Sequence, residues 1–180
     1  MIPENKKLIL IVNGKPRAGK DTFAELLNEF IPVYKYSSID KVKTIAIDCG
    51  WKGAKEEKDR KFLSELKRIT TEYNDMAYND ILEKVEMFDN GDIAEEIMII
   101  DVREPEEIER LTNELGALTV FIKNDNVPEV TSNYADANVE NFDYDIIVDN
   151  SGTLEDFEEA VEEFVYVISI LTMKDDKEEE

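Results

Sequence analysis

The sequence predicts an α/β fold in which a five-stranded parallel sheet carries helices on both faces. Short runs of almost wholly apolar residues recur along the chain, and such runs are typical of strands that are buried on both faces of a sheet. Longer segments with apolar residues at helical spacing lie between them. Elements that alternate in this way form a three-layer fold with right-handed crossovers between parallel strands.

The order of the expected elements follows from these runs. Five strands are expected over 8–12, 33–36, 97–102, 118–122 and 144–148. Helices are expected where apolar stripes span 23–30, 39–46, 62–73, 76–88, 106–115 and 154–171. Ser37 with Asp40, and Thr153 with Asp156, have the spacing of a capping box. Gly116 is expected just past a helix end, and segment 124–142, which has no clear period, is too long for an ordinary connection.

Composition narrows the class of protein. The 180 residues suffice for one domain with a proper core, and the single cysteine, Cys49, excludes an intrachain disulfide. There is no signal-like N-terminus and no run of membrane-spanning length, so a cytoplasmic protein that binds no membrane is expected. Histidine is absent, which excludes histidine acid–base chemistry and histidine metal ligands.

The charge is strongly negative but unevenly placed. The formal net charge is −22, yet residues 1–68 carry 15 Lys and Arg against 10 Asp and Glu, whereas residues 69–180 carry 6 against 33. Such a chain is not expected to bind nucleic acid. Its basic first third suits a small anionic ligand that is held locally. The basic stretch 52–61 is equally well interpreted as a solvated helix face.

A glycine-rich turn follows the first expected strand and opens the first expected helix. It contains Gly14-x-x-x-x-Gly19-Lys20, which is the pattern of a phosphate-binding loop. The two glycines permit the close approach of backbone N–H groups to phosphate, at the start of a helix that favours anions. Lys20 would contact the β- and γ-phosphates of a nucleotide. The residues predicted to bind the cofactor are Gly14, Lys15, Arg17, Ala18, Gly19, Lys20, Asp21 and Thr22.

Asp21 is a departure from the common motif, which has Ser or Thr at this position to hold Mg²⁺. A carboxylate can itself bind Mg²⁺, which prefers hard oxygen ligands, and Thr22 could instead supply the hydroxyl. The sequence leaves this choice open. It also allows Asp21 to be an ordinary acid in the first turn of a helix.

A second acid is expected near the loop. Asp101 ends the third strand and Arg103 follows it, and an acid in this place forms the second half of the nucleotide–Mg²⁺ site in phosphate-loop enzymes. The alternative is that Asp101 caps the next turn while Arg103 pairs with Glu104 or Glu107. The ends of the fourth and fifth strands, at 123–124 and 149–153, could line a base or ribose pocket or form ordinary turns.

Transfer of a phosphoryl group needs cations, and a movable segment commonly supplies them. Segment 124–142 contains neither Lys nor Arg, whereas 52–68 contains several. We therefore predict that Arg60 and Arg68 contact the acceptor or the transferred group, with Lys61 and Lys67 as further candidates. The hypothesis fails if replacing both arginines by alanine leaves turnover and acceptor binding intact.

Five stretches together resemble the deoxynucleoside monophosphate kinases of phages and bacteria, which are related to animal-type phosphomevalonate kinases. They read GKPRAGKDT, YSSIDKVK, GW…DRKFLSELK…TEYND, DVREPEEIERL and DYDIIVDNSGTLEDF, and the similarity as a whole extends from residue 8 to about 165. The resemblance implies a P-loop NTPase fold that uses ATP and Mg²⁺. It implies one kinase domain over 1–173, with an acceptor or lid segment at about 38–91 and an acidic tail at 174–180.

The resemblance also implies roles for individual residues. Catalysis would involve Lys20, Asp101 and Arg103, to which the basic segment 52–68 adds Arg68. The metal ligands would be drawn from Asp21, Thr22 and Asp101. The acceptor monophosphate would lie near Ser38, Asp40 and Lys43, and the basic segment 52–68 adds Arg60 and Arg68 to these candidates. Family members often have a histidine before the fifth strand, where this sequence has none over 131–136, so acceptor choice is left open.

The favoured function is therefore transfer of the ATP γ-phosphate to a nucleoside or deoxynucleoside monophosphate. A kinase of another phosphorylated metabolite, such as phosphomevalonate, and a catalytically idle nucleotide-binding module are the alternatives. A GTPase switch is disfavoured, because the Asn-Lys-x-Asp motif that reads guanine is absent. Small nucleotides are the expected partners, and a homodimer is left open.

Overall fold

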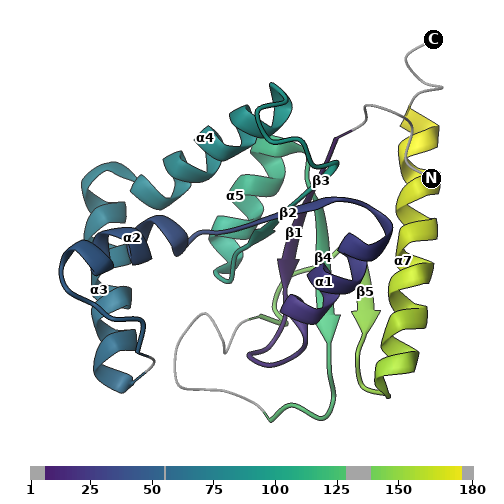
Figure 1. Ribbon diagram of the computed structural model, residues 1–180, viewed down its shortest axis with the longest axis horizontal. Coiled ribbons are helices and arrows are strands. Elements are labelled where there is room, and N and C mark those ends of the chain that lie inside the picture. Colours follow the sequence, from purple (N-terminus) through teal and green to yellow (C-terminus); the bar gives the residue numbers. More distant parts are fainter. Residues whose placement is uncertain (1–6, 55, 129–138, 176–180) are drawn as a thin grey trace. The chain divides into compact units, whose positions relative to one another are not determined.

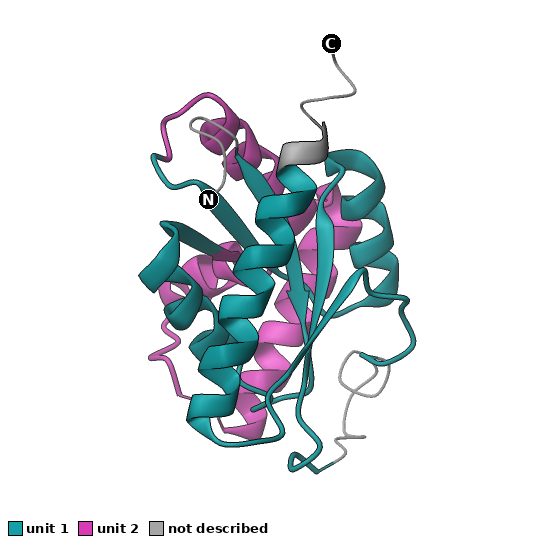
Figure 2. Ribbon diagram, turned by 90° about the vertical axis from the view of Figure 1, so that its right-hand side faces the viewer, with its two compact units in different colours: residues 1–35, 94–180 teal, residues 36–93 magenta. Residues whose placement is uncertain are grey.

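The computed structural model describes residues 7–54, 56–128 and 139–175. Figure 1 shows the course of the chain, and Figure 2 shows that it divides into two compact units. Unit 1 comprises residues 1–35 and 94–180, and unit 2 comprises residues 36–93. The predicted role of 38–91 as an acceptor or lid segment stays a prediction, and residues 176–180 of the expected tail lie outside the described ranges.

A five-stranded parallel sheet forms the centre of unit 1, as the sequence predicted. Its strands are β1 (Leu8–Asn13), β2 (Val33–Ser37), β3 (Ile97–Asp101), β4 (Leu118–Lys123) and β5 (Ile146–Asp149). Their order across the sheet is β2-β3-β1-β4-β5, and β2 continues into unit 2. The central strand β1 pairs in parallel with β3 and with β4, with Ile11 opposite Ile100 and Thr119. The carboxyl ends of β1, β3 and β4 therefore meet at one edge.

Helices cover both faces of the sheet. Helices α1 (Lys20–Phe30) and α7 (Leu154–Asp175) pack against each other on one face, with Phe23 and Phe164 in edge-to-face contact at 5.2 Å between ring centroids. Alternation along β1 sends Leu10 and Val12 toward this layer and turns Ile11 away from it. Helix α5 (Pro105–Leu115) buries Ile108 and Leu111 and contacts β1. The three-layer prediction is therefore confirmed.

Unit 2 consists of three helices that pack on one another. They are α2 (Asp40–Asp48), α3 (Glu57–Asn74) and α4 (Met76–Asp89). Helix α3 begins where the carboxylate of Asp59 accepts the backbone N–H of Glu56 at 3.2 Å. Asp75, in the left-handed conformation with φ of 55°, separates α3 from α4.

The predicted helix boundaries are confirmed where side chains form the caps. Thr153 and Asp156 form the expected capping box, because the Asp156 carboxylate accepts the Thr153 N–H at 2.7 Å while the Thr153 hydroxyl accepts the Asp156 N–H at 3.2 Å. Gly116 ends α5 with φ of 60°. The Ser37–Asp40 box is present in one direction, from the Ser37 N–H to the Asp40 carboxylate at 2.9 Å, and α2 has Ile39 at its N-cap.

The fifth strand begins two residues later than the predicted start at Tyr144. The carboxylate of Asp145 accepts hydrogen bonds from the backbone N–H and the hydroxyl of Thr119, at 2.8 and 2.7 Å. A side chain therefore takes the place of backbone pairing at this point. The regular ladder between β4 and β5 starts at Ile146, opposite Val120.

Candidate nucleotide-phosphate site

The phosphate loop joins β1 to α1 and packs against the ends of β4 and β5. Gly14 has a φ of 155°, and a Cβ there would lie 2.6 Å from the carbonyl oxygen of Ile122. Gly19 has a φ of 104°, and a Cβ there would collide with the side-chain amide of Asn150. That amide donates a hydrogen bond to the Ala18 carbonyl oxygen at 2.8 Å. Both motif glycines are thus required by the protein's own packing.

Buried Asn13 fixes the entry to the loop. Its Oδ1 accepts the N–H of Gly14 at 2.8 Å, and its Nδ2 donates to the hydroxyl of Tyr144 at 2.8 Å. The Tyr144 hydroxyl in turn donates to the Val139 carbonyl oxygen at 2.8 Å, and its ring stacks on Phe121. Burial raises the pKa of Tyr144 to about 12, while the bond from Asn13 lowers it.

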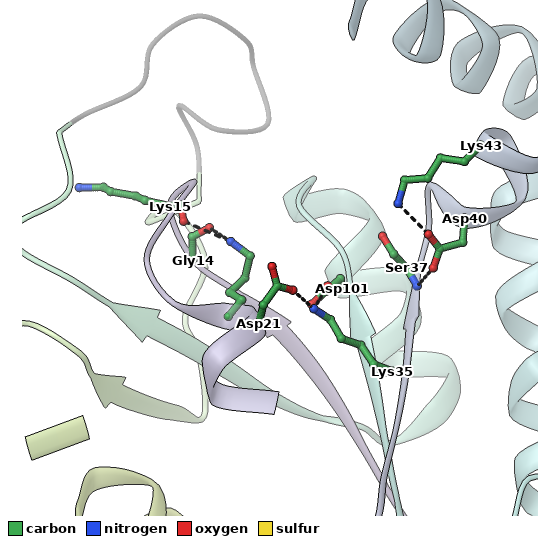
Figure 3. Close-up of polar contacts among 9 residues, drawn as sticks. Gly14, Lys15, Asp21, Lys35, Ser37, Asp40, Lys43 and Asp101 are labelled. Atoms are coloured by element: carbon green, nitrogen blue, oxygen red, sulfur yellow. Dashed lines mark hydrogen bonds and ion pairs between the residues drawn. The ribbon is translucent and has the colours of Figure 1, made fainter. Parts of the chain in front are cut away.

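The two loop lysines bind groups of the protein itself. The Lys20 ammonium donates to the carbonyl oxygens of Gly14 and Lys15, at 2.7 and 3.1 Å (Figure 3). Lys15 forms an ion pair with Glu140 at 3.0 Å. A phosphate that replaced these partners would receive two cations from the loop, since charged donors make the strongest hydrogen bonds to phosphate.

A cavity of about 400 Å³ opens beside the loop. Its lining joins the predicted catalytic and metal-binding residues of unit 1 in one place, which the sequence could only suggest from the positions of strand ends. The lining residues are Pro16, Arg17, Gly19, Lys20, Asp21, Thr22, Asp101 and Arg103. Helix α5 has Glu104 at its N-cap, so Asp101 does not cap that helix.

Lys35 is the residue of this site that the sequence analysis missed. Its ammonium lies between the carboxylates of Asp21 and Asp101, with a short contact to Asp21 and a distance of 3.0 Å to Asp101 (Figure 3). Burial lowers the pKa of Lys35, but the hydrogen bonds and charges of Asp21 and Asp101 prevail and raise it. Burial raises the pKa of Asp101, against the lowering effects of Lys35 and Lys20. The arrangement is a lysinium ion held between two acids.

Asp21, Thr22 and Asp101 are suitable donors for Mg²⁺, because all three present hard oxygen atoms to the same cavity. A cation already lies between the two carboxylates, which shows that their charges converge. Among the described residues, no three acidic or cysteine side chains are grouped so as to hold a metal ion. Mg²⁺ at this place would complete its ligands with phosphate oxygens and water, as is usual for this ion.

The predicted acceptor residues lie in unit 2, where several of them are engaged with one another. The hydroxyl of buried Ser38 accepts a hydrogen bond from the Lys67 ammonium at 3.5 Å, and Asp40 forms an ion pair with Lys43 at 2.8 Å. Arg68 is about half exposed and pairs with Glu65 and Glu72 of its own helix, at 3.0 and 2.7 Å. These two acids raise the pKa of the Arg68 guanidinium. Arg60 is exposed on the same helix.

The ends of β4 and β5 are joined by turn interactions. The N–H of Asp125 donates to the hydroxyl of Ser151 at 3.0 Å, and the side chain of Asn126 donates to the Ser151 carbonyl oxygen at 2.8 Å. Lys123 pairs with Asp125 at 2.8 Å. These contacts are those of ordinary turns, and a base or ribose pocket at these strand ends stays a prediction. The segment 131–136, where the sequence resemblance led us to look for a histidine, lies outside the described residues.

No protein-family model matches the chain, and no curated protein matches its sequence. Among solved structures, the chain resembles shikimate kinase from Aquifex aeolicus, with 15% identity, a TM-score of 0.49, and coverage of 92% of this chain and 99% of that one. It resembles the APS kinase CysC of Mycobacterium tuberculosis with 12% identity, a TM-score of 0.43, and coverage of 91% and 97%.

A third similar structure is a protein from Chloroflexus aurantiacus, with 15% identity and a TM-score of 0.41. The match covers 65% of this chain but spans only 59% of that protein. No helix within the described ranges is long and apolar enough to cross a membrane. The parallel sheet and the loop between β1 and α1 give the chain a three-layer P-loop fold.

Proposed function

We propose that the protein transfers the γ-phosphate of ATP to a nucleoside or deoxynucleoside monophosphate and gives the diphosphate. One observation carries the proposal. Lys20, the acids Asp21 and Asp101, and Arg103 all line one cavity at the phosphate loop. The site combines a phosphate loop, two convergent carboxylates, the ammonium of Lys20 and the guanidinium of Arg103. Such a site suits phosphoryl transfer, which depends on positioning and charge neutralisation.

The loop would bind the triphosphate through its backbone N–H groups and Lys20. For this, Lys20 exchanges the carbonyl oxygens of Gly14 and Lys15 for phosphate oxygens. Arg17 and Arg103 line the same cavity and would offset the charge of the transferred group. Mg²⁺, when bound with the nucleotide, would neutralise the phosphates, and Asp21, Thr22 and Asp101 are the residues that would hold it.

A phosphorylated acceptor is favoured by the chemistry of unit 2. Lys67 beside the buried hydroxyl of Ser38 offers an ammonium and a hydroxyl to one anionic group. Lys43 lies nearby in the chain and is paired with Asp40, which it would leave to reach a phosphate. Arg60 and Arg68 remain candidates for contacts with the acceptor or the transferred group. Free nucleotides, rather than nucleic acid, suit a chain with a net charge of −22.

The test is a turnover assay with ATP, Mg²⁺ and a panel of acceptors, scored by release of ADP. The panel contains the common ribonucleoside and deoxyribonucleoside monophosphates, together with phosphomevalonate. We expect turnover with at least one nucleoside monophosphate and a background rate without an acceptor. Turnover with phosphomevalonate alone would replace the proposed acceptor class, and no turnover with any acceptor would favour an idle binding module.

The Lys20→Ala variant tests the loop assignment. We expect transfer to be abolished while the fold remains intact, because Lys20 bonds the carbonyl oxygens of Gly14 and Lys15, both within the loop, and is not part of the apolar core. Lys58→Ala is the matched control, since Lys58 forms an exposed ion pair with Glu56 in unit 2. An active Lys20→Ala variant would show that the phosphates bind elsewhere.

A further inference from the structure

Lys35 places a positive charge where the proposed function requires a metal ion. The residue comes from β2, which precedes the acid-bearing strand β3 by about sixty residues in the chain but neighbours it in the sheet. Its side chain contacts both carboxylates of the site at once, Asp21 from α1 and Asp101 from the end of β3 (Figure 3). The exposed fraction is 29% for the Lys35 side chain and 21% for Asp101, so this contact is largely shielded from solvent, whereas the Asp21 side chain is 88% exposed.

The charges explain why this contact forms. Two carboxylates at one site repel each other and also repel incoming phosphate. One ammonium between them compensates one of the two negative charges and links the first turn of α1 to the end of β3. A divalent cation would compensate both charges, and it would then repel the ammonium from the same oxygen atoms.

We propose that the Lys35 ammonium occupies the metal site of the nucleotide-free protein and that a divalent cation binds there only by displacing it. The inference rests on the proposed function in taking Asp21 and Asp101 as metal ligands. Lys35 thereby weakens the binding of free metal ions and makes metal binding depend on the nucleotide, whose phosphates supply further ligands. In this role Lys35 is a positioning residue that acts through the two acids.

The experiment measures Mn²⁺, a paramagnetic substitute for Mg²⁺, on the full chain without nucleotide. Electron paramagnetic resonance of free Mn²⁺ gives its dissociation constant for the wild type, for Lys35→Met and for Lys35→Arg. Loss of a unit charge within contact distance of a divalent ion should strengthen its binding by about tenfold or more in Lys35→Met. Lys35→Arg keeps the cation and should bind Mn²⁺ as weakly as the wild type.

Two further variants locate the effect. Lys35→Met combined with Asp101→Asn should lose the gain, because the combination removes one of the two acids that bind the metal. Lys58→Met removes the same charge from an exposed ion pair with Glu56 and should leave Mn²⁺ affinity unchanged. If Lys35→Met does not fold, Lys35→Gln takes its place as a polar, uncharged variant, with circular dichroism as the check of folding.

An unchanged Mn²⁺ affinity in a folded Lys35→Met or Lys35→Gln variant would overturn the proposal. So would a gain that Lys35→Arg shares, because that gain could not arise from the loss of a cation. The assay contains neither ATP nor an acceptor, so its result is independent of turnover. An inactive protein whose Lys35→Met variant still gains Mn²⁺ affinity would refute the kinase proposal and leave this one standing.

Discussion

Gly19 should be a sensitive position of the phosphate loop, and Gly19→Ala tests how the loop is built. Gly19 has a φ of 104°, where a residue with a Cβ costs about 1–2 kcal/mol. The added Cβ would also collide with the side-chain amide of Asn150. To move away, Asn150 would give up its bond to the Ala18 carbonyl oxygen, which is worth about 1 kcal/mol. Gly19→Ala should therefore lower the free energy of unfolding by about 2–3 kcal/mol.

A double-mutant cycle separates the two contributions. Asn150→Ala alone should cost about 1 kcal/mol, because it removes the bond to Ala18. In the double variant that bond is already lost, so the two effects should sum to about 1 kcal/mol more than the measured cost. Urea denaturation followed by circular dichroism gives all four free energies. The unfolding slope of each variant, which reports the surface exposed on unfolding, should remain that of the wild type.

Two results would refute this account. A Gly19→Ala variant within about 0.5 kcal/mol of the wild type would mean that neither the backbone conformation nor the collision matters. Fully additive effects would mean that Asn150 and Gly19 do not interact. Binding of ATP gives an independent check. Gly19→Ala should weaken ATP binding even under solution conditions in which the variant is fully folded.

Three further predictions concern other parts of the chain. The stability difference between Tyr144→Phe and the wild type should shrink as the pH rises from 10 toward 12. The reason is that a tyrosine whose pKa is raised on folding stabilises the protein below its unfolded pKa and loses that effect as the pH rises above it. Urea midpoints of both proteins across this pH range measure the difference. Thr153→Ala should cost about 1 kcal/mol by removing the cap of α7, with Ser at the same position as the conservative control. The double variant Arg60→Ala with Arg68→Ala should lower turnover and acceptor affinity but leave the urea midpoint unchanged, because both side chains are exposed; unchanged turnover would remove them from the site.

The sequence predicted those parts of the fold that depend on neighbours along the chain. Apolar runs located the strands, and the capping box at Thr153 located the start of the last helix to the residue. The loop motif located the cavity, because its position between a strand and a helix is itself local. Each of these signals lies within about ten residues of the feature that it predicts.

The missed features depend on contacts between distant segments. Asn150 supports the loop from 132 positions beyond its partner Ala18, and no periodicity links the two. Lys35 lies on the edge strand β2, whose residues are all partly exposed, so no alternation marks one side chain as special. Its role arises only from the sheet order, which places β2 beside β3 and thereby brings Lys35 to Asp101. We therefore expect a lysine on an edge strand that follows a phosphate loop to be a candidate partner for the acids of that loop.

Three lysines around the phosphate loop already have partners within the protein, and these partners would reduce the net free energy of nucleotide binding. Lys20 bonds two carbonyl oxygens, Lys15 pairs with Glu140, and Lys35 bridges Asp21 and Asp101. A triphosphate bound at this loop would therefore not gain the full strength of each charged contact, because each contact would replace an existing one. Affinity is the difference between the two sets, so loss of an internal partner should strengthen binding. Glu140→Gln releases Lys15 from its ion pair and should thus tighten ATP binding, whereas Lys15→Ala should weaken it. Isothermal titration calorimetry measures both affinities. Equal weakening by the two variants would show that Glu140 acts on the nucleotide in some other way.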